Sequence, residues 1–204
     1  MARRSQSNTL ENNMNNTTKG MPGSNNNGSK EKTENKQTLN GLFEKALREA
    51  YSCEKQLIDV LAEMAKNAYS EELQDAFKEH KEQTQRHLER IEKIYDRLHI
   101  ASDQEETNKV IETLFEIGKK VITEYEKSPL RDSSLIIVAQ KVEHVEIALY
   151  GSLCELADVL GYHKVIDILE RTLEEEKMTD ERLTDIAREV NDEAFEMAEE
   201  LQEY

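Results

Sequence analysis

Five acidic residues fall on helix faces that are otherwise apolar. They are Glu54, Glu143, Glu146, Glu176 and Asp180. With a helical period of about 3.6 residues, each shares a face with apolar side chains in one of three predicted helical stretches, 47–61, 138–153 and 169–187. Because burying an unpartnered carboxylate is costly, such residues usually pair with a cation or bind a metal. No Lys or Arg lies on these faces, so the pattern predicts one or two bound divalent cations.

The helix predicted over residues 71–98 adds imidazole side chains. Its inward face contains His80 and Thr84, followed by His87 or Leu88. Carboxylates combined with imidazole, without thiolates at metal-binding spacing, suit iron or manganese better than a structural zinc site. We therefore predict His80 as a ligand, with a core histidine hydrogen-bonded to Thr84 as the alternative, and we place His87 at the periphery.

An ordinary structural role is the alternative for each acid. Glu54 could lie at the edge of its helix face and pair with Arg48 or Lys55. Glu176 belongs to a run of three Glu residues, which is typical of a solvated face. Asp180 could instead cap a helix. Glu143 and Glu146, which lie one helical turn apart on the same face, are the hardest to explain without a metal.

Charge and composition exclude several classes of partner. Residues 1–37 are rich in Asn, Ser, Thr, Gly and Lys, and we interpret them as a disordered tail before a single domain at 38–204. The chain carries −16 in total and the tail +3, which leaves −19 for the domain and argues against nucleic acid. No apolar run is long enough for a membrane span or a signal peptide. Two cysteines, Cys53 and Cys154, are too few for a disulfide scaffold, so we expect a cytoplasmic protein.

Helical periodicity extends through the whole domain, so the predicted fold class is all-α. The predicted helices are 39–67, 71–98, about 105–126, 131–161 and 163–200. Short connections make the first two and the last two into antiparallel hairpins, and the middle helix joins the hairpins as a crossover. This arrangement is that of a ferritin-like four-helix bundle with an additional crossover helix.

Several motifs of the domain resemble the YciE/YciF family of ferritin-like bacterial proteins, which are stress-associated and also described as ferroxidases. The motifs are AYSCEKQL (50–57), the His80-x-x-x-Thr84 stretch that leads into HLERIE (87–92), SPLRDSSLIIVAQKVEHVEIALYGSL (128–153), LGYHKV (160–165) and TLEEEKMTDERLTDIA (172–187). They follow the family order and cover essentially the whole domain, whereas the Asn-rich tail lies outside the resemblance.

The resemblance implies a ferritin- or rubrerythrin-like bundle that forms a homodimer and holds a di-metal centre. The residues that match the family's pattern of ligands are Glu54, His80, Glu143, Glu146, Glu176 and Asp180. The implied cofactor is a pair of iron ions, with manganese as the alternative. His87 does not match a fixed feature of the family and is left out of the ligand set.

The leading functional hypothesis is a ferroxidase that oxidises Fe²⁺ with O2 or peroxide. A second hypothesis is a non-catalytic, stress-induced structural or interaction protein in which the acids hold a structural ion. A third is peroxide disproportionation of the manganese-catalase type. All three require metal ions as partners, and none involves a membrane or a nucleic acid.

Overall fold

A computed structural model describes residues 37–101 and 106–200, which form five helices and no strand. The helices are α2 (Leu39–Asn67), α3 (Glu71–Leu98), α4 (Lys109–Glu124), α5 (Pro129–Val159) and α6 (His163–Glu200). The prediction of an all-α domain is confirmed for this part of the chain. Nearly all of the predicted tail lies outside the described residues.

The helix ends follow from local capping. The side chain of Ser70 accepts a hydrogen bond from the backbone N–H of Leu73 at the start of α3. Ser128 caps α5, whose first residue is Pro129, two positions earlier than predicted, because proline is favourable where no intrahelical N–H bond is needed. Gly161 closes α5 with a φ of 73°, a left-handed conformation that suits glycine.

The crossover helix α4 begins later than predicted. The predicted start at residue 105 lies outside the described residues, and the helix itself starts at Lys109. The side chain of Asn108 accepts hydrogen bonds from the backbone N–H groups of Val110 (2.9 Å) and Ile111 (3.2 Å). Asn108 therefore satisfies two of the N–H groups that a helix start leaves without partners.

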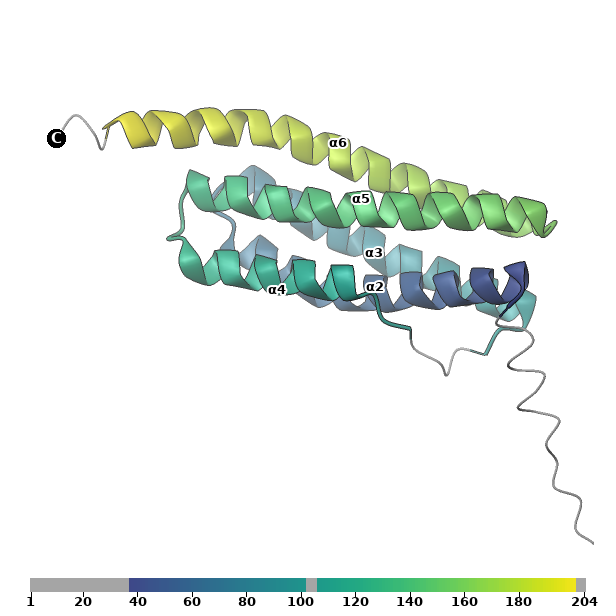
Figure 1. Ribbon diagram of the computed structural model, residues 1–204. Coiled ribbons are helices and arrows are strands. Elements are labelled where there is room, and N and C mark those ends of the chain that lie inside the picture. The colour runs from purple at the N-terminus through teal and green to yellow at the C-terminus, as the bar shows by residue number, and fades with distance from the viewer. Residues whose placement is uncertain (1–36, 102–105, 201–204) are drawn as a thin grey trace, which may run out of the picture.

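The four long helices form two antiparallel hairpins, α2 with α3 and α5 with α6, which lie side by side (Figure 1). The carboxylate of Asp132, at the start of α5, accepts hydrogen bonds from the backbone N–H groups of Tyr69 (2.7 Å) and Ser70 (2.8 Å) in the α2–α3 turn. Because α3 ends at the opposite end of the bundle, the chain must return along its length before α5 begins. Helix α4 makes this return and packs against α5 and α2.

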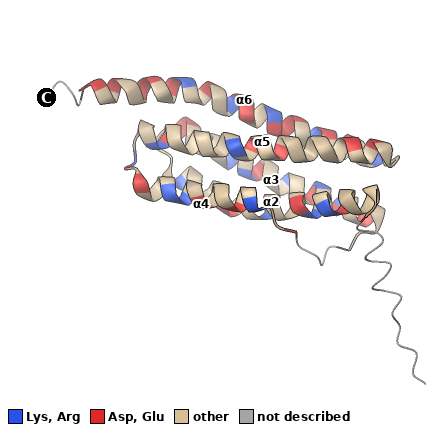
Figure 2. Ribbon diagram, in the orientation of Figure 1, with Lys and Arg blue, Asp and Glu red and all other residues tan. Residues whose placement is uncertain are grey.

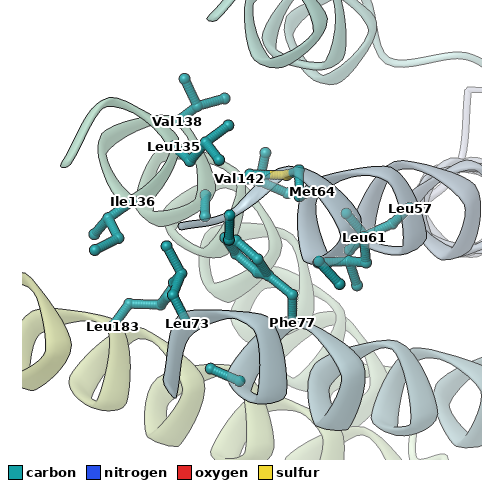
Figure 3. Close-up of a cluster of buried hydrophobic side chains, with 14 of the residues drawn as sticks. Leu57, Leu61, Met64, Leu73, Phe77, Leu135, Ile136, Val138, Val142 and Leu183 are labelled. Atoms are coloured by element: carbon teal, nitrogen blue, oxygen red, sulfur yellow. The ribbon is translucent and has the colours of Figure 1, made fainter. Parts of the chain in front are cut away.

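Two apolar clusters fill the bundle, one toward each end. The first includes Leu61, Phe77 and Leu135, which come from α2, α3 and α5 and belong to one buried cluster (Figure 3). The second includes Leu47 and Leu153 near the other end. Each fully buried side chain of this size contributes about 1.5–3 kcal/mol to stability. The middle of the bundle, between the clusters, is polar.

Helix α6 is the longest helix and extends beyond the start of α5 at its C-terminal end (Figure 1). Acidic residues are frequent along it (Figure 2), and Phe195 is 64% exposed near its end. A homodimer contact at this end stays a prediction. None of the helices in the described part of the chain combines the length and low polarity needed to cross a membrane.

Candidate metal centre

A layer of polar side chains crosses the middle of the bundle between the two apolar clusters. All four long helices contribute to it, and each side chain is at most 3% exposed. The layer consists of Glu54 from α2, His80, Thr84 and His87 from α3, Glu143 and Glu146 from α5, and Glu176 from α6. Among these residues are four carboxyl groups and no Lys or Arg. The layer is therefore a concentration of buried negative charge.

The layer contains two groups of ligand-type atoms. One group is formed by His80, Glu143, Glu146 and Glu176, and the other by Glu54, His87 and Glu176. Within each group the ligand atoms lie within 4.8 Å of one another, and Glu176 belongs to both. Two adjacent sites that share one carboxylate have the layout expected for a pair of metal ions bridged by a Glu side chain.

The first group joins α3 to α5 and α6. His80 Nε2 lies 3.1 Å from Glu143 Oε1. The thiol of Cys53 donates a hydrogen bond to Glu146 Oε1 at 3.2 Å. Burial and the neighbouring Glu146 raise the pKa of the Cys53 thiol well above its usual value, so the sulfur stays protonated and acts as a donor, not as a thiolate ligand.

The second group is centred on His87. Its Nδ1 atom lies 3.2 Å from Glu54 Oε1 and 2.9 Å from Glu176 Oε1. The hydroxyl group of Tyr150 donates a hydrogen bond to the same oxygen of Glu54. Burial and the charge of Glu54 raise the pKa of Tyr150, which keeps the phenol protonated and able to donate. Glu54 is thus held in place by α5 while its other oxygen is left free.

The opposite nitrogen of His87 is fixed by an ion pair. His87 Nε2 lies 3.0 Å from Glu175 Oε2, and Arg90 binds both oxygens of Glu175 at 2.8 Å. Arg90 also donates to the hydroxyl of Thr172 at 3.1 Å. Burial raises the pKa of Glu175, but the hydrogen bonds from Arg90 and His87 outweigh this and lower it to about 2. Because Glu175 stays charged, it accepts a hydrogen bond from a proton on His87 Nε2. The ring is thereby oriented with Nδ1 toward Glu54 and Glu176, as in the carboxylate–histidine pairs that support metal sites.

The buried oxygens of this layer lack enough hydrogen-bond donors. The atoms with neither a hydrogen bond nor an ion-pair contact are Glu54 Oε2, His80 Nδ1, Thr84 Oγ1, Glu143 Oε2, Glu146 Oε2 and Glu176 Oε2. Leaving one such polar atom buried and unpaired costs about 1–3 kcal/mol. A cation between the carboxylates would satisfy several of them at once, so the donor set fits a metal ion.

In the absence of a metal, protons must neutralise the layer. Burial lowers the pKa of His80, but neighbouring carboxylates, above all Glu143, raise it to about 9. Burial likewise lowers the pKa of His87, and the acids facing it raise it to about 11. Burial raises the pKa of Glu176, which the hydrogen bond from His87 offsets in part, to give about 7. Burial and three nearby carboxylates raise the pKa of Glu146 well above its usual value.

Five of the six predicted ligands come together in this layer, and the prediction that they bind a metal stays a prediction. Asp180 lies outside both groups: its side chain is 22% exposed and its Oδ2 atom lies 3.4 Å from Nε2 of His144. Asp180 Oδ1 also accepts a bond from Gln140 at 3.4 Å. It follows Glu176 by one turn but faces the outer edge of the α5–α6 contact.

The expectation that His87 lies at the periphery was wrong. Its side chain is 0% exposed and bridges the two inner acids of the second group. The signal was its position seven residues after His80, because two helical turns return a side chain to the same face. The alternative that Glu54 lies at the edge of its helix face is wrong, since Glu54 is 0% exposed. Of its two alternative partners, Arg48 pairs with Glu44 instead, at 3.1 Å.

Comparison with known proteins gives the family. Residues 38–196 match the model of the "Domain of unknown function (DUF892)" family. The chain belongs to the DUF892 family. It is 42% identical over 153 residues to Protein YciF of Escherichia coli (strain K12), an alignment that covers 75% of this chain and 92% of YciF. The resemblance found in the sequence motifs is thereby confirmed.

Two solved structures of relatives have the same fold. The crystal structure of the E. coli stress protein YciF superposes with a TM-score of 0.73 at 41% identity, and covers 76% of this chain and 98% of that one. YcfI from Rhodopseudomonas palustris, proposed to be a structural protein, superposes with a TM-score of 0.69 at 29% identity. The superposition covers 72% of this chain and 94% of YcfI. The DUF892 fold therefore spans the part of the chain that carries the polar layer.

Proposed function

We propose that this DUF892 protein is a ferritin-like bundle that binds two divalent metal ions in its polar layer, with Fe²⁺ as the metal it oxidises. The observation that carries the proposal is the pair of overlapping ligand groups that share Glu176. Such a pair, built from all four helices of a bundle, is the arrangement in which ferritin-like proteins hold two metal ions.

The donor set supports iron or manganese. One group offers one imidazole and three carboxylates, and the other offers one imidazole and two carboxylates, counting Glu176 in both. Oxygen-rich sites with a single nitrogen favour these metals over zinc, which prefers closed sites of nitrogen and sulfur. The only cysteine beside the layer, Cys53, is held protonated by burial, which raises its pKa.

The charge of the layer supports two ions rather than one. The carboxylates of Glu54, Glu143, Glu146 and Glu176 carry four negative charges when ionised, and two divalent cations carry four positive charges. With both histidines neutral the sum is zero, which is the condition under which a fully buried ionic cluster is tolerated. A single dication would leave half of the acids protonated or unpaired.

The reaction proposed is the oxidation of Fe²⁺ as a substrate. Two Fe²⁺ ions and one H2O2 consume two protons and give two Fe³⁺ and two water molecules, each iron losing one electron. The protein contributes geometry and charge: Glu175 and Arg90 hold His87 in one orientation, Tyr150 holds Glu54, and the flanking apolar clusters exclude water. Because these ligand side chains are already held in place, little energy is needed to rearrange them when the charge on the iron changes.

Anaerobic titration with Fe²⁺, followed by addition of H2O2, tests this function. We expect saturable uptake of two Fe²⁺ per chain, one for each ligand group, and ferric absorbance after the oxidant is added. Glu146→Gln should lose part of the uptake, whereas Glu155→Gln, an exposed position on the same helix, should not. Absence of saturable uptake in the unaltered protein would reject the proposal.

A structural role for the metal is the second candidate. It is favoured by the position of the layer, which connects four helices between two separate apolar clusters, and by the description of the relative YcfI as a proposed structural protein. In that case two ions bind and raise the melting temperature, but Fe²⁺ oxidation proceeds at the rate seen without protein. The same titration distinguishes the two candidates.

A further inference from the structure

A cavity of about 290 Å³ opens between α3 and α6, on one side of the polar layer. Its wall includes Phe77, Glu79, His80 and Gln83 from α3, and Thr179, Arg182 and Leu183 from α6. His80 is therefore both a wall residue of this cavity and a member of the first ligand group. The cavity leads from the surface to the His80 side of the centre.

The cavity extends inward from the surface, because some of the residues that line it are almost fully buried. Phe77 and Leu183 are 1% and 3% exposed and belong to the first apolar cluster, so they form an apolar floor. His80 lies beside this floor and is also 3% exposed. Its Nδ1 atom has no hydrogen-bond partner within the protein. A small molecule that reached the floor would thus meet the His80 ring, whose Nδ1 atom is itself buried.

Two pairs of polar side chains cross the mouth of the cavity from α3 to α6. Glu79 forms an ion pair with Arg182, and both side chains are well exposed. One helical turn further along, the hydroxyl of Thr179 donates a hydrogen bond to Oε1 of Gln83 at 3.1 Å. Both pairs are formed by side chains near the surface, where rotamer changes are fast, so the mouth can open without movement of the helices.

The charge and polarity of the wall indicate which kind of molecule can enter the cavity. The only carboxylate in the wall, Glu79, is paired with Arg182, so the mouth has no free negative charge to attract a metal ion. A cation would also meet the guanidinium group, whereas an uncharged molecule would not be opposed. The amide of Gln83 and the hydroxyl of Thr179 along the path can hydrogen-bond to a small polar solute.

We propose that this cavity is the access route by which a small uncharged oxidant, hydrogen peroxide, reaches the metal centre, with Gln83 and Thr179 as the residues that control its width. The proposal rests on the proposed function for the identity of the oxidant. The path itself follows from the cavity and from His80 in its wall, and does not require a bound metal.

The path is tested first in the metal-free protein, with dissolved O2 as a small uncharged paramagnetic probe. Nuclear relaxation of the His80 ring protons under O2 pressure measures how often the probe reaches them. Gln83→Phe should reduce this relaxation enhancement about tenfold, as expected when a side chain closes a gated path. Gln85→Phe, the same change two residues away in the α2–α3 groove, should leave it unchanged. Equal enhancement in both variants would overturn the proposal.

The second arm uses the iron-loaded protein. Gln83→Phe should lower the second-order rate constant for oxidation by H2O2 about tenfold while Fe²⁺ uptake stays at the level of the unaltered protein. Thr179→Phe narrows the mouth from the opposite helix and replaces Gln83→Phe if that variant does not fold. An unchanged rate constant in a folded, fully loaded variant would overturn the proposal. If the unaltered protein does not oxidise iron, the proposed function fails, and the relaxation measurement still decides on the path.

Discussion

Replacement of Glu176 by Gln should have opposite effects on the metal-free and the metal-bound protein. Gln has the shape of a protonated Glu and carries no charge, so Glu176→Gln removes one negative charge from the shared position of the two ligand groups. In the metal-free protein this relieves repulsion among buried carboxylates. In the presence of metal it removes the ligand common to both groups.

The magnitude follows from the pKa of Glu176, which rises from 4.5 to about 7 on folding, mainly because of burial. A raised carboxyl pKa means that the folded state binds a proton that the unfolded state releases, so stability falls as the pH rises from 4.5 to 7. With about 1.4 kcal/mol for each tenfold change in proton affinity, the full cost above pH 7 is about 3 kcal/mol. Gln does not carry this cost at any pH.

Urea unfolding at pH 4 and pH 8 measures the effect, with a chelator present. We expect Glu176→Gln to be more stable than the unaltered protein by about 3 kcal/mol at pH 8 and equally stable at pH 4. With Mn²⁺ at about 100 times its dissociation constant, the unaltered protein should gain about 2.7 kcal/mol and the variant much less. Glu174→Gln, an exposed neighbour, is the control. A variant that is less stable than the parent at pH 8 without metal would refute the reasoning.

Three further predictions concern groups around the centre. Glu175→Gln should weaken Mn²⁺ binding about 10–100-fold, because His87 loses the charged partner that orients it; chelator competition measures this, and an unchanged affinity would contradict the assigned role. Asp132→Asn should lower the free energy of unfolding by about 1.5–3 kcal/mol, because two backbone N–H groups of the α2–α3 turn lose a charged acceptor; urea unfolding checks it. Metal binding at pH 7 should release protons, since the pKa values of His80 and His87 are about 9 and 11 and a ligand imidazole must be neutral. The affinity should therefore fall as the pH is lowered, and a pH-stat titration that shows no proton release would contradict this.

The fold could be predicted largely because its signals are local. The boundaries of α2 and α3 follow from the apolar period and from Ser70, whose hydroxyl caps α3. The start of α4 was placed too early because several residues before it can cap a helix, and the choice of Asn108 depends on its contact with Glu49 of α2 at 2.5 Å. That contact joins residues far apart in the sequence, so a local pattern does not contain it.

The site was predicted less completely, for the same physical reason. The apolar period places Glu143 and Glu146 inside without further information. The position of His87 depends on the rotation of α3 within the bundle, which is fixed by its contacts with α6 through Arg90 and Glu175. Asp180 fits the helical period of α6 as well as Glu176 does. The way α6 packs against α5 decides which of the two reaches the centre, and it leaves Asp180 beside His144.

The location of the acidic and histidine side chains between two separately filled apolar regions has a consequence for how the molecule tolerates change. Leu61 and Phe77 on one side and Leu47 and Leu153 on the other contact different neighbours, so a substitution at one end alters few contacts at the other. Turns and helix ends can then vary in length, or acquire new binding surfaces, while the acidic and histidine side chains in the middle of the bundle stay in place. Divergence among relatives should therefore be greatest at the two extremities and least at mid-height.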